Sequence, residues 1–160
     1  MKNALSHLVL SLGVVLSLCA LGCTGALSQR YPSRPPAGMA AARAEADERE
    51  CLGVAARATS ERAWAYIGCM VAKGHTVGVA FHVQNEPTYL GVTQTRPHEG
   101  SAVARELEDC RRSAYAAGRA GGPSRDGIVD RMEGAFRTCL DPLGYTVQRA
   151  GAPTPGRSGG

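Results

Sequence analysis

The feature that most constrains the fold of this chain is a nine-residue pattern that occurs twice. Residues 69–77 read CMVAKGHTV and residues 139–147 read CLDPLGYTV, so Cys, Gly, Thr and Val return in the same places. A ring precedes each Thr, and another aromatic residue, Tyr66 or Phe136, stands three residues before each Cys. A further Cys lies upstream of each copy. We interpret the pattern as two copies of one unit: a helix with a Cys, a turn, a second helix with a Cys, and a Gly that ends it.

Cysteine usage predicts covalent links between these helices. The chain has six Cys; Cys19 and Cys23 belong to the N-terminal segment discussed below, and the other four are Cys51, Cys69, Cys110 and Cys139. An even number in an exported chain favours disulfides, and four Cys allow three pairings. The duplicated layout favours Cys51–Cys69 and Cys110–Cys139, because the two Cys of each antiparallel helix pair come level when the chain turns between them.

Hydrophobic periodicity predicts four helices. We expect them over about residues 39–58, from the Thr59-Ser60 cap to about 73, over about 101–120, and from the Ser124 cap to a close at Pro142 and Gly144. Only eight aromatic residues occur in the chain (one Trp, five Tyr and two Phe), while Ala and Gly are abundant. A core of small side chains is marginal against chain entropy, so two disulfides are expected to contribute substantially to stability.

The connector between the copies, residues 78–100, carries a strand-like pattern. Val77, Val79, Phe81 and Val83 alternate with small or polar residues, and a turn-forming stretch precedes a second short apolar run at 89–92. An isolated hairpin is marginal in water, so this segment is either a short hairpin lying on the helices or irregular. The expected fold is therefore mainly α: two disulfide-stapled antiparallel helical hairpins, residues 39–77 and 101–147, with a short β-hairpin as an option between them.

The N-terminus has the pattern of an export signal. Lys2 precedes an apolar run from Leu8 to Leu21, which is too short to span a bilayer comfortably and is typical of a signal-peptide core. The run ends in Ala-Leu-Gly-Cys at Cys23, which resembles the lipobox of bacterial lipoproteins, although Leu is the usual residue at the place of Ala20. The resemblance implies cleavage before Cys23 and lipidation of its thiol. The alternatives are an uncleaved anchor or an ordinary signal with Cys23 as a plain thiol.

The predicted organisation follows from these boundaries. Residues 1–22 are the signal peptide, 23–38 a Pro-rich tether, 39–148 the helical domain, and 149–160 a disordered Gly- and Pro-rich tail. Two acyl groups on Cys23 would give stable membrane attachment. Thr24 follows Cys23 where an Asp would signal inner-membrane retention in enteric bacteria, so the outer membrane is the expected location.

The repeated pattern itself resembles a motif of small uncharacterised bacterial lipoproteins. Those proteins typically read Cys-Met-x-x-x-Gly-Tyr at the end of a helix that is paired with an earlier Cys-bearing helix. The resemblance covers residues 51–77 and 110–147, with His75 in place of the Tyr in the first copy and Leu140 in place of the Met in the second. It implies the stapled-helix architecture and no biochemical activity.

The sequence contains no strong motif for a metal, cofactor, nucleic-acid or catalytic site. Spacings of 18, 41 and 29 residues between the four Cys favour disulfides over a zinc site, so no metal and no cofactor are expected. The formal net charge is +4 and the Arg residues are dispersed among acids, which argues against nucleic-acid binding. A catalytic cluster would need His82 or His98 to converge with a carboxylate such as Glu86 or Glu99. No Ser sits in a nucleophile elbow.

We therefore expect a non-enzymatic, membrane-anchored envelope lipoprotein that acts as an interaction or scaffold module for an unknown envelope protein. The alternative is a small periplasmic module that binds a ligand or inhibits an enzyme through the 78–99 loop. Trp64, Phe81 and Tyr89 are the candidate contact surface, because an exposed aromatic side chain is a common anchor at interfaces. The alternative hypothesis is that Trp64 is buried and packs in the core.

Overall fold

The computed structural model describes residues 25–150, which form five α-helices, a short 3-10 helix and four β-strands. Cys23, the apolar run before it and residues 151–160 lie outside this part. The elements in chain order are α2 (Gly25–Arg30), β1 (Ser33–Arg34), α3 (Ala41–Arg57), α4 (Arg62–Ala72), β2 (Thr76–Val83), β3 (Glu86–Gln94), α5 (Gly100–Arg119), α6 (Arg125–Leu140), η1 (Asp141–Leu143) and β4 (Tyr145–Ala150).

The predicted mainly α fold is wrong, because the strands make a four-stranded antiparallel sheet in the order β1-β2-β3-β4. The 78–100 connector supplies most of β2 and all of β3, which pair along their length from Val77 with Val92 to Val83 with Glu86. Strand β4 pairs antiparallel with β3, on the edge of β3 that faces away from β2. The protein is an α+β domain in which the central hairpin is extended by strands from both ends of the chain.

The sheet explains the repeat better than the helices alone. Each copy is a helix–helix–strand unit, α3–α4–β2 and α5–α6–β4, and β3 lies between the two strands. Val77 and Val147 hold the same place in the repeated pattern, and both pair with Val92. The two copies therefore pair with β3 in the same register, and the Thr-Val that ends each pattern lies near the start of a strand, Thr76–Val77 in β2 and Thr146–Val147 in β4.

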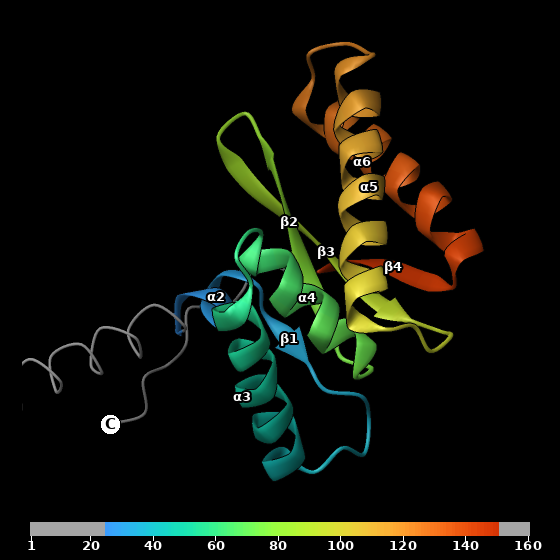
Figure 1. Ribbon diagram of the computed structural model, residues 1–160. Coiled ribbons are helices and arrows are strands. Elements are labelled where there is room, and N and C mark those ends of the chain that lie inside the picture. Colours follow the sequence, from blue (N-terminus) through green and yellow to red (C-terminus); the bar gives the residue numbers. More distant parts are fainter. Residues whose placement is uncertain (1–24, 151–160) are drawn as a thin grey trace, which may run out of the picture.

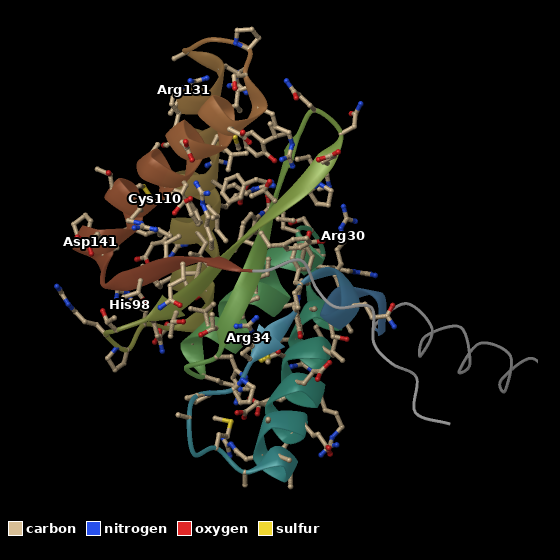
Figure 2. The ribbon with its side chains drawn as sticks, turned by 180° about the vertical axis from the view of Figure 1, so that it is seen from behind. Arg30, Arg34, His98, Cys110, Arg131 and Asp141 are labelled. Carbon is tan, nitrogen blue, oxygen red and sulfur yellow. A yellow bond between two sulfur atoms is a disulfide. The ribbon has the colours of Figure 1, made fainter. Side chains whose placement is uncertain are left out.

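The long helices lie on one face of the sheet, as the two opposite views in Figures 1 and 2 show. Alternate strand residues point into the core beneath them, because side chains alternate between the faces of a strand. Phe81 is 2% exposed and meets Phe136 of α6 edge-on, with ring centroids 5.0 Å apart. The two hairpins join through the contact of α4 with α5.

The helix ends confirm some of the expected signals and correct others. Gly74 (φ 84°) and Gly144 (φ 88°) adopt the left-handed conformation, so both Gly stops of the repeat are confirmed. The predicted hydroxyl caps are not: α4 is preceded by Glu61 in a left-handed conformation, and the Ser124 hydroxyl makes no capping hydrogen bond to α6.

Both predicted disulfides are present. Cys51 of α3 is bonded to Cys69 of α4, and Cys110 of α5 to Cys139 of α6, with Cα atoms 5.5 and 5.6 Å apart. Each bond lies within one copy of the repeat and staples its two helices. The two antiparallel helical hairpins, expected from the Cys spacing, are therefore real elements of a larger α+β fold.

The segments predicted as tether and tail carry structure inside the described range. Helix α2 and strand β1 fall in the expected tether; Ser33 pairs with Val77, and Leu27 and Tyr31 pack against the core. Arg149, assigned to a disordered tail, lies in β4, where its guanidinium pairs with Asp130 and Glu133 of α6. No helix within residues 25–150 is long and apolar enough to cross a membrane.

Candidate functional site

A groove of about 560 Å³ follows α4 between α3 and α5. Its walls are apolar or small along most of their length, and its polar groups are few. The lining residues are Val54, Ser60, Glu61, Trp64, Ala65, Cys69, Ala72, Lys73, Gly100, Ser101, Ala104 and Arg105. Residues of both hairpins therefore line the groove, and Cys69 of the first disulfide is one of them.

Small residues in α4 and α5 account for the groove. The two helices approach closely at Gly68, where an added Cβ would lie 2.4 Å from the carbonyl oxygen of Gly100 and 2.9 Å from the Cβ of Ala104. Beside this contact the facing positions Ala65 and Ala72 carry only methyl groups. Because the side chains of Ala65 and Ala72 are short, the space beside the close contact of α4 with α5 stays open as a channel.

One wall of the groove is Trp64, the single Trp of the chain, whose side chain is 9% exposed. The Arg111 guanidinium of α5 lies 5.0 Å from the centre of its ring and 5.5 Å from the ring of Tyr115. Such a cation over an aromatic face is an attractive contact. Trp64 is thus held in place as part of the wall and does not project from the surface.

At the other end of α4 the groove is bounded by Lys73. Its Nζ lies 2.9 Å from Oε2 of Glu50 and 3.3 Å from Oδ1 of Asp47, both on α3. The pKa of Lys73 is raised, first by the hydrogen bond with Glu50 against the opposing effect of burial, and further by Asp47. Lys73 is a fixed cation at the end of an otherwise apolar channel.

Behind Lys73 lies a buried carboxylate–imidazole pair. Asp47 and His75 are each 1% exposed, and His75 Nε2 lies 3.2 Å from Asp47 Oδ2. Burial acts to raise the pKa of Asp47, but hydrogen bonds from His75 and Lys73 and the positive charges of Lys73 and Arg43 outweigh it, so the pKa is lowered. The other ring nitrogen of His75, Nδ1, is buried without a hydrogen-bond partner.

The second copy holds an equivalent pair. The hydroxyl of Tyr145 donates to Glu106 Oε2, and His98 Nδ1 lies 3.6 Å from the same oxygen. Burial raises the pKa of the Tyr145 hydroxyl, and the Glu106 carboxylate raises it further. Tyr145 and His75 hold the same place in the repeat.

The carboxylates of the two pairs also correspond. Asp47 stands four residues before Cys51, and Glu106 stands four before Cys110. In each copy one acid–ring contact therefore ties the first helix to the start of the strand: His75 directly precedes β2, and Tyr145 is the first residue of β4. The rings and the acids directly before the Cys, Glu50 and Asp109, stand out in the sequence, whereas Asp47 and Glu106, one helical turn earlier, were not predicted. Comparing the copies at that spacing would have found them.

The predicted contact residues do not form one surface. Phe81 is buried in the core, Trp64 is a groove wall, and Tyr89 is half-buried on β3. His82 lies on β2 opposite Pro87, and its backbone N–H donates to the hydroxyl of Tyr115. His98 instead contacts Glu106, so the structure does not bring these two histidines to one carboxylate. Within residues 25–150 no group of three or more His, Cys, Asp or Glu side chains is placed to hold a metal ion.

The fold and site define a disulfide-stapled α+β domain with an apolar groove between its two repeats. Comparison of the chain with protein-family models, with curated proteins and with solved structures gave no match.

Proposed function

We propose that this protein is a non-enzymatic envelope lipoprotein, anchored to the membrane through Cys23, whose folded domain binds an apolar ligand in the α3–α4–α5 groove. The observation that carries the binding proposal is the groove itself. Its volume of about 560 Å³ falls within the range of about 300–1,000 Å³ typical of small-molecule sites. Apolar walls with a few polar groups at defined places are also typical of such sites.

The anchoring part rests on the sequence and on the disulfides. The Ala-Leu-Gly-Cys ending at Cys23 resembles a lipobox. Two disulfides fit a protein that folds in an oxidising compartment outside the cytosol. The outer membrane remains the expected location, with Thr24 after Cys23.

The groove is a better binding site than the 78–99 segment that the sequence suggested. Residues 78–83 and 86–94 belong to β2 and β3, and Phe81 is buried in the core. A segment held in two strands has little freedom to close on a ligand. The groove, in contrast, is open to solvent and lined by side chains that need not move.

Binding can be tested through Trp64, because the only Trp of the chain lines the groove. The protein is produced with Cys23→Ser and exported, so that the disulfides form and no detergent is needed. Titration with the uncharged probe N-phenyl-1-naphthylamine should give a saturable change in Trp64 emission. Ala65→Phe fills the groove and should abolish it, whereas Ala116→Phe on the exposed side of α5 should not. A non-saturable response, or equal responses from both variants, would contradict the proposal.

The anchor is tested separately by the intact mass of wild-type protein from envelope fractions. We expect a chain that begins at Cys23 and carries added acyl groups, with a mass four hydrogens below that of the reduced form. A mature chain with an unmodified thiol at Cys23 would overturn the anchoring part and leave the groove proposal standing.

A further inference from the structure

We infer that α2 and β1, residues 25–34, form a membrane-contact surface that holds the folded domain directly against a bilayer with anionic headgroups. The inference rests on the proposed function, since it requires the acyl anchor at Cys23, and it names which part of the domain meets the lipid. Two features of the molecule carry it. One is the length of chain between Cys23 and the folded part, and the other is the charge on α2 and β1.

The chain between the anchor and the folded part is very short. Thr24 is the only residue between Cys23 and Gly25, the first residue of α2. Because consecutive Cα atoms are about 3.8 Å apart, the Cα atoms of Cys23 and Gly25 are separated by at most about 8 Å. Acyl chains on Cys23 insert into the hydrocarbon layer, so α2 lies at the level of the lipid headgroups.

The segment that follows the anchor belongs to the fold and is not a free tether. Leu27 and Tyr31 pack against the core, and the N–H of Gly78 in β2 donates to the carbonyl oxygen of Pro32 at 2.8 Å. Strand β1 then pairs with β2 in the sheet. The adjacent prolines at 35 and 36 come only after β1, so flexibility there does not separate the lipid from the sheet.

The charge of this segment suits an anionic surface. From Thr24 to Ala44 the chain contains Arg30, Arg34 and Arg43 and no Asp or Glu. Arg43 is paired with Asp47 of α3. Arg30 and Arg34 are exposed, and within residues 25–150 neither takes part in an ion pair. A guanidinium presents parallel N–H donors that match the oxygens of a lipid phosphate.

Arg34 lies on the face of the sheet opposite the long helices. It pairs with Thr76, and paired residues of adjacent strands point their side chains to the same face. The next residue of β2, Val77, is fully buried in the core, so Thr76 and Arg34 point the other way. Figure 2 views the sheet from that side and shows Arg34 in β1 and Arg30 in the neighbouring α2. Both lie on the part of the domain that Cys23 brings to the bilayer.

The test measures which part of the acylated protein lies at the headgroups. The protein carries one added cysteine, Gln29→Cys on α2 or Asp126→Cys on α6, which is labelled with a fluorophore. Both positions are exposed, and α2 and α6 lie apart in Figure 1. Intact mass first confirms the acyl groups. The protein is then reconstituted into vesicles of phosphatidylglycerol and phosphatidylcholine that contain lipid with a spin-labelled headgroup, a short-range quencher. We expect quenching at position 29 to be several-fold stronger than at position 126.

Variants assign the charge preference to the two arginines. Quenching at position 29 should be weaker on vesicles of phosphatidylcholine alone and should also fall at high salt, because salt screens the attraction of exposed charges. Arg30→Gln with Arg34→Gln should remove the difference between the two kinds of vesicle. Arg49→Gln with Arg112→Gln is the matched control, because it removes two exposed positive charges from α3 and α5 and should keep the difference.

The outcomes separate this inference from the anchor itself. Equal quenching of the two labels in acylated protein would overturn the contact surface and leave the anchor standing. A preference for phosphatidylglycerol that survives Arg30→Gln with Arg34→Gln would overturn the assignment to these residues. Protein without acyl groups that fails to join the vesicles would overturn the anchor at Cys23, and the contact surface with it.

Discussion

At the scale of single residues, the two acid–ring contacts set the position of the groove's cation and of the strands. Asp47 and His75 are both buried, and a buried carboxylate is stable only when cations or hydrogen-bond donors surround it. His75, Lys73 and Arg43 supply them. In the second copy the Tyr145 hydroxyl donates to Glu106, a carboxylate that is only partly buried. The duplicated contact therefore tolerates either ring as long as the acid has a donor.

Asp47→Asn should destabilise the domain by about 1–3 kcal/mol, because it removes the charge that His75, Lys73 and Arg43 share in a buried site. The free energy of unfolding, measured in urea, checks this value. Glu45→Gln on the same helix is the control, since Glu45 is 70% exposed and should change stability by less than about 0.5 kcal/mol. Equal effects of the two substitutions would show that the buried contact contributes nothing.

The pH dependence of stability follows from the lowered pKa of Asp47. The unfolded chain takes up a proton near the ordinary value of about 3.9, whereas the folded chain does so only at lower pH. The contribution of Asp47 is therefore fully present above about pH 5 and is lost as the pH falls through its folded pKa. The stability difference between wild type and Asp47→Asn should shrink from pH 7 to pH 3. A difference that stays constant over this range would contradict the assignment.

At the scale of secondary-structure elements, the contact of α4 with α5 joins the two copies and shapes the groove. It depends on Gly68, which has no space for a side chain against Gly100 and Ala104. A second tight contact, Gly118 of α5 against Met132 of α6, holds the second hairpin together. Arg131, labelled in Figure 2, closes the turn between those helices by donating to the carbonyl oxygens of Gly118 and Gly122.

Gly68→Ala should cost about 1–3 kcal/mol of unfolding free energy, because its methyl group would force α4 and α5 apart. Gly134→Ala in α6 is the matched control, for which we expect the opposite change in stability. An added Cβ there meets nothing within 4 Å, so the higher helix propensity of Ala should stabilise the protein by about 0.5–1 kcal/mol. Thermal melts of both variants test the contact, and a stabilising Gly68→Ala would refute it.

At the scale of the whole molecule, the disulfides staple helices within each copy, while the sheet and the α4–α5 contact join the copies. Cys51 and Cys110 are buried, and Cys69 and Cys139 pack at the edge of the core. The covalent links are thus part of the interior of a domain that has few large side chains. They restrict the unfolded chain and leave the long-range strand pairing to noncovalent forces.

Replacing Cys51 and Cys69 together by Ala should lower the free energy of unfolding by about 3 kcal/mol, from the loop of 18 residues that the bond closes. The Cys110/Cys139 double substitution should cost slightly more, because its loop of 29 residues is longer. Urea unfolding of both variants under oxidising conditions gives the comparison. Peptide mapping of the wild type should show only the two bonds within the copies; a bond between copies would contradict the structure.

Much of the local structure could be predicted from the sequence. Helix positions followed from periodicity, and the Gly stops at 74 and 144 from the need for a left-handed residue. The disulfide pairing followed from the duplicated spacing. These features depend on neighbours a few residues away, or on a repeat that is visible in the sequence. The β2–β3 hairpin was one of two alternatives. The alternation of apolar residues predicts strands, but the sequence does not show which elements the hairpin would pack against.

The remaining features depend on contacts between distant residues. A strand such as β4 has no hydrogen-bond partner within itself, so Tyr145–Ala150 became a strand only because β3 offers a free edge in register. The groove and the buried Asp47–His75 contact likewise exist only after α3, α4 and α5 have packed. The sequence by itself determined the helical hairpins and their covalent staples. The tertiary structure decided the sheet, the α+β class and the candidate site, because each of these is made of groups that meet only when the chain has folded.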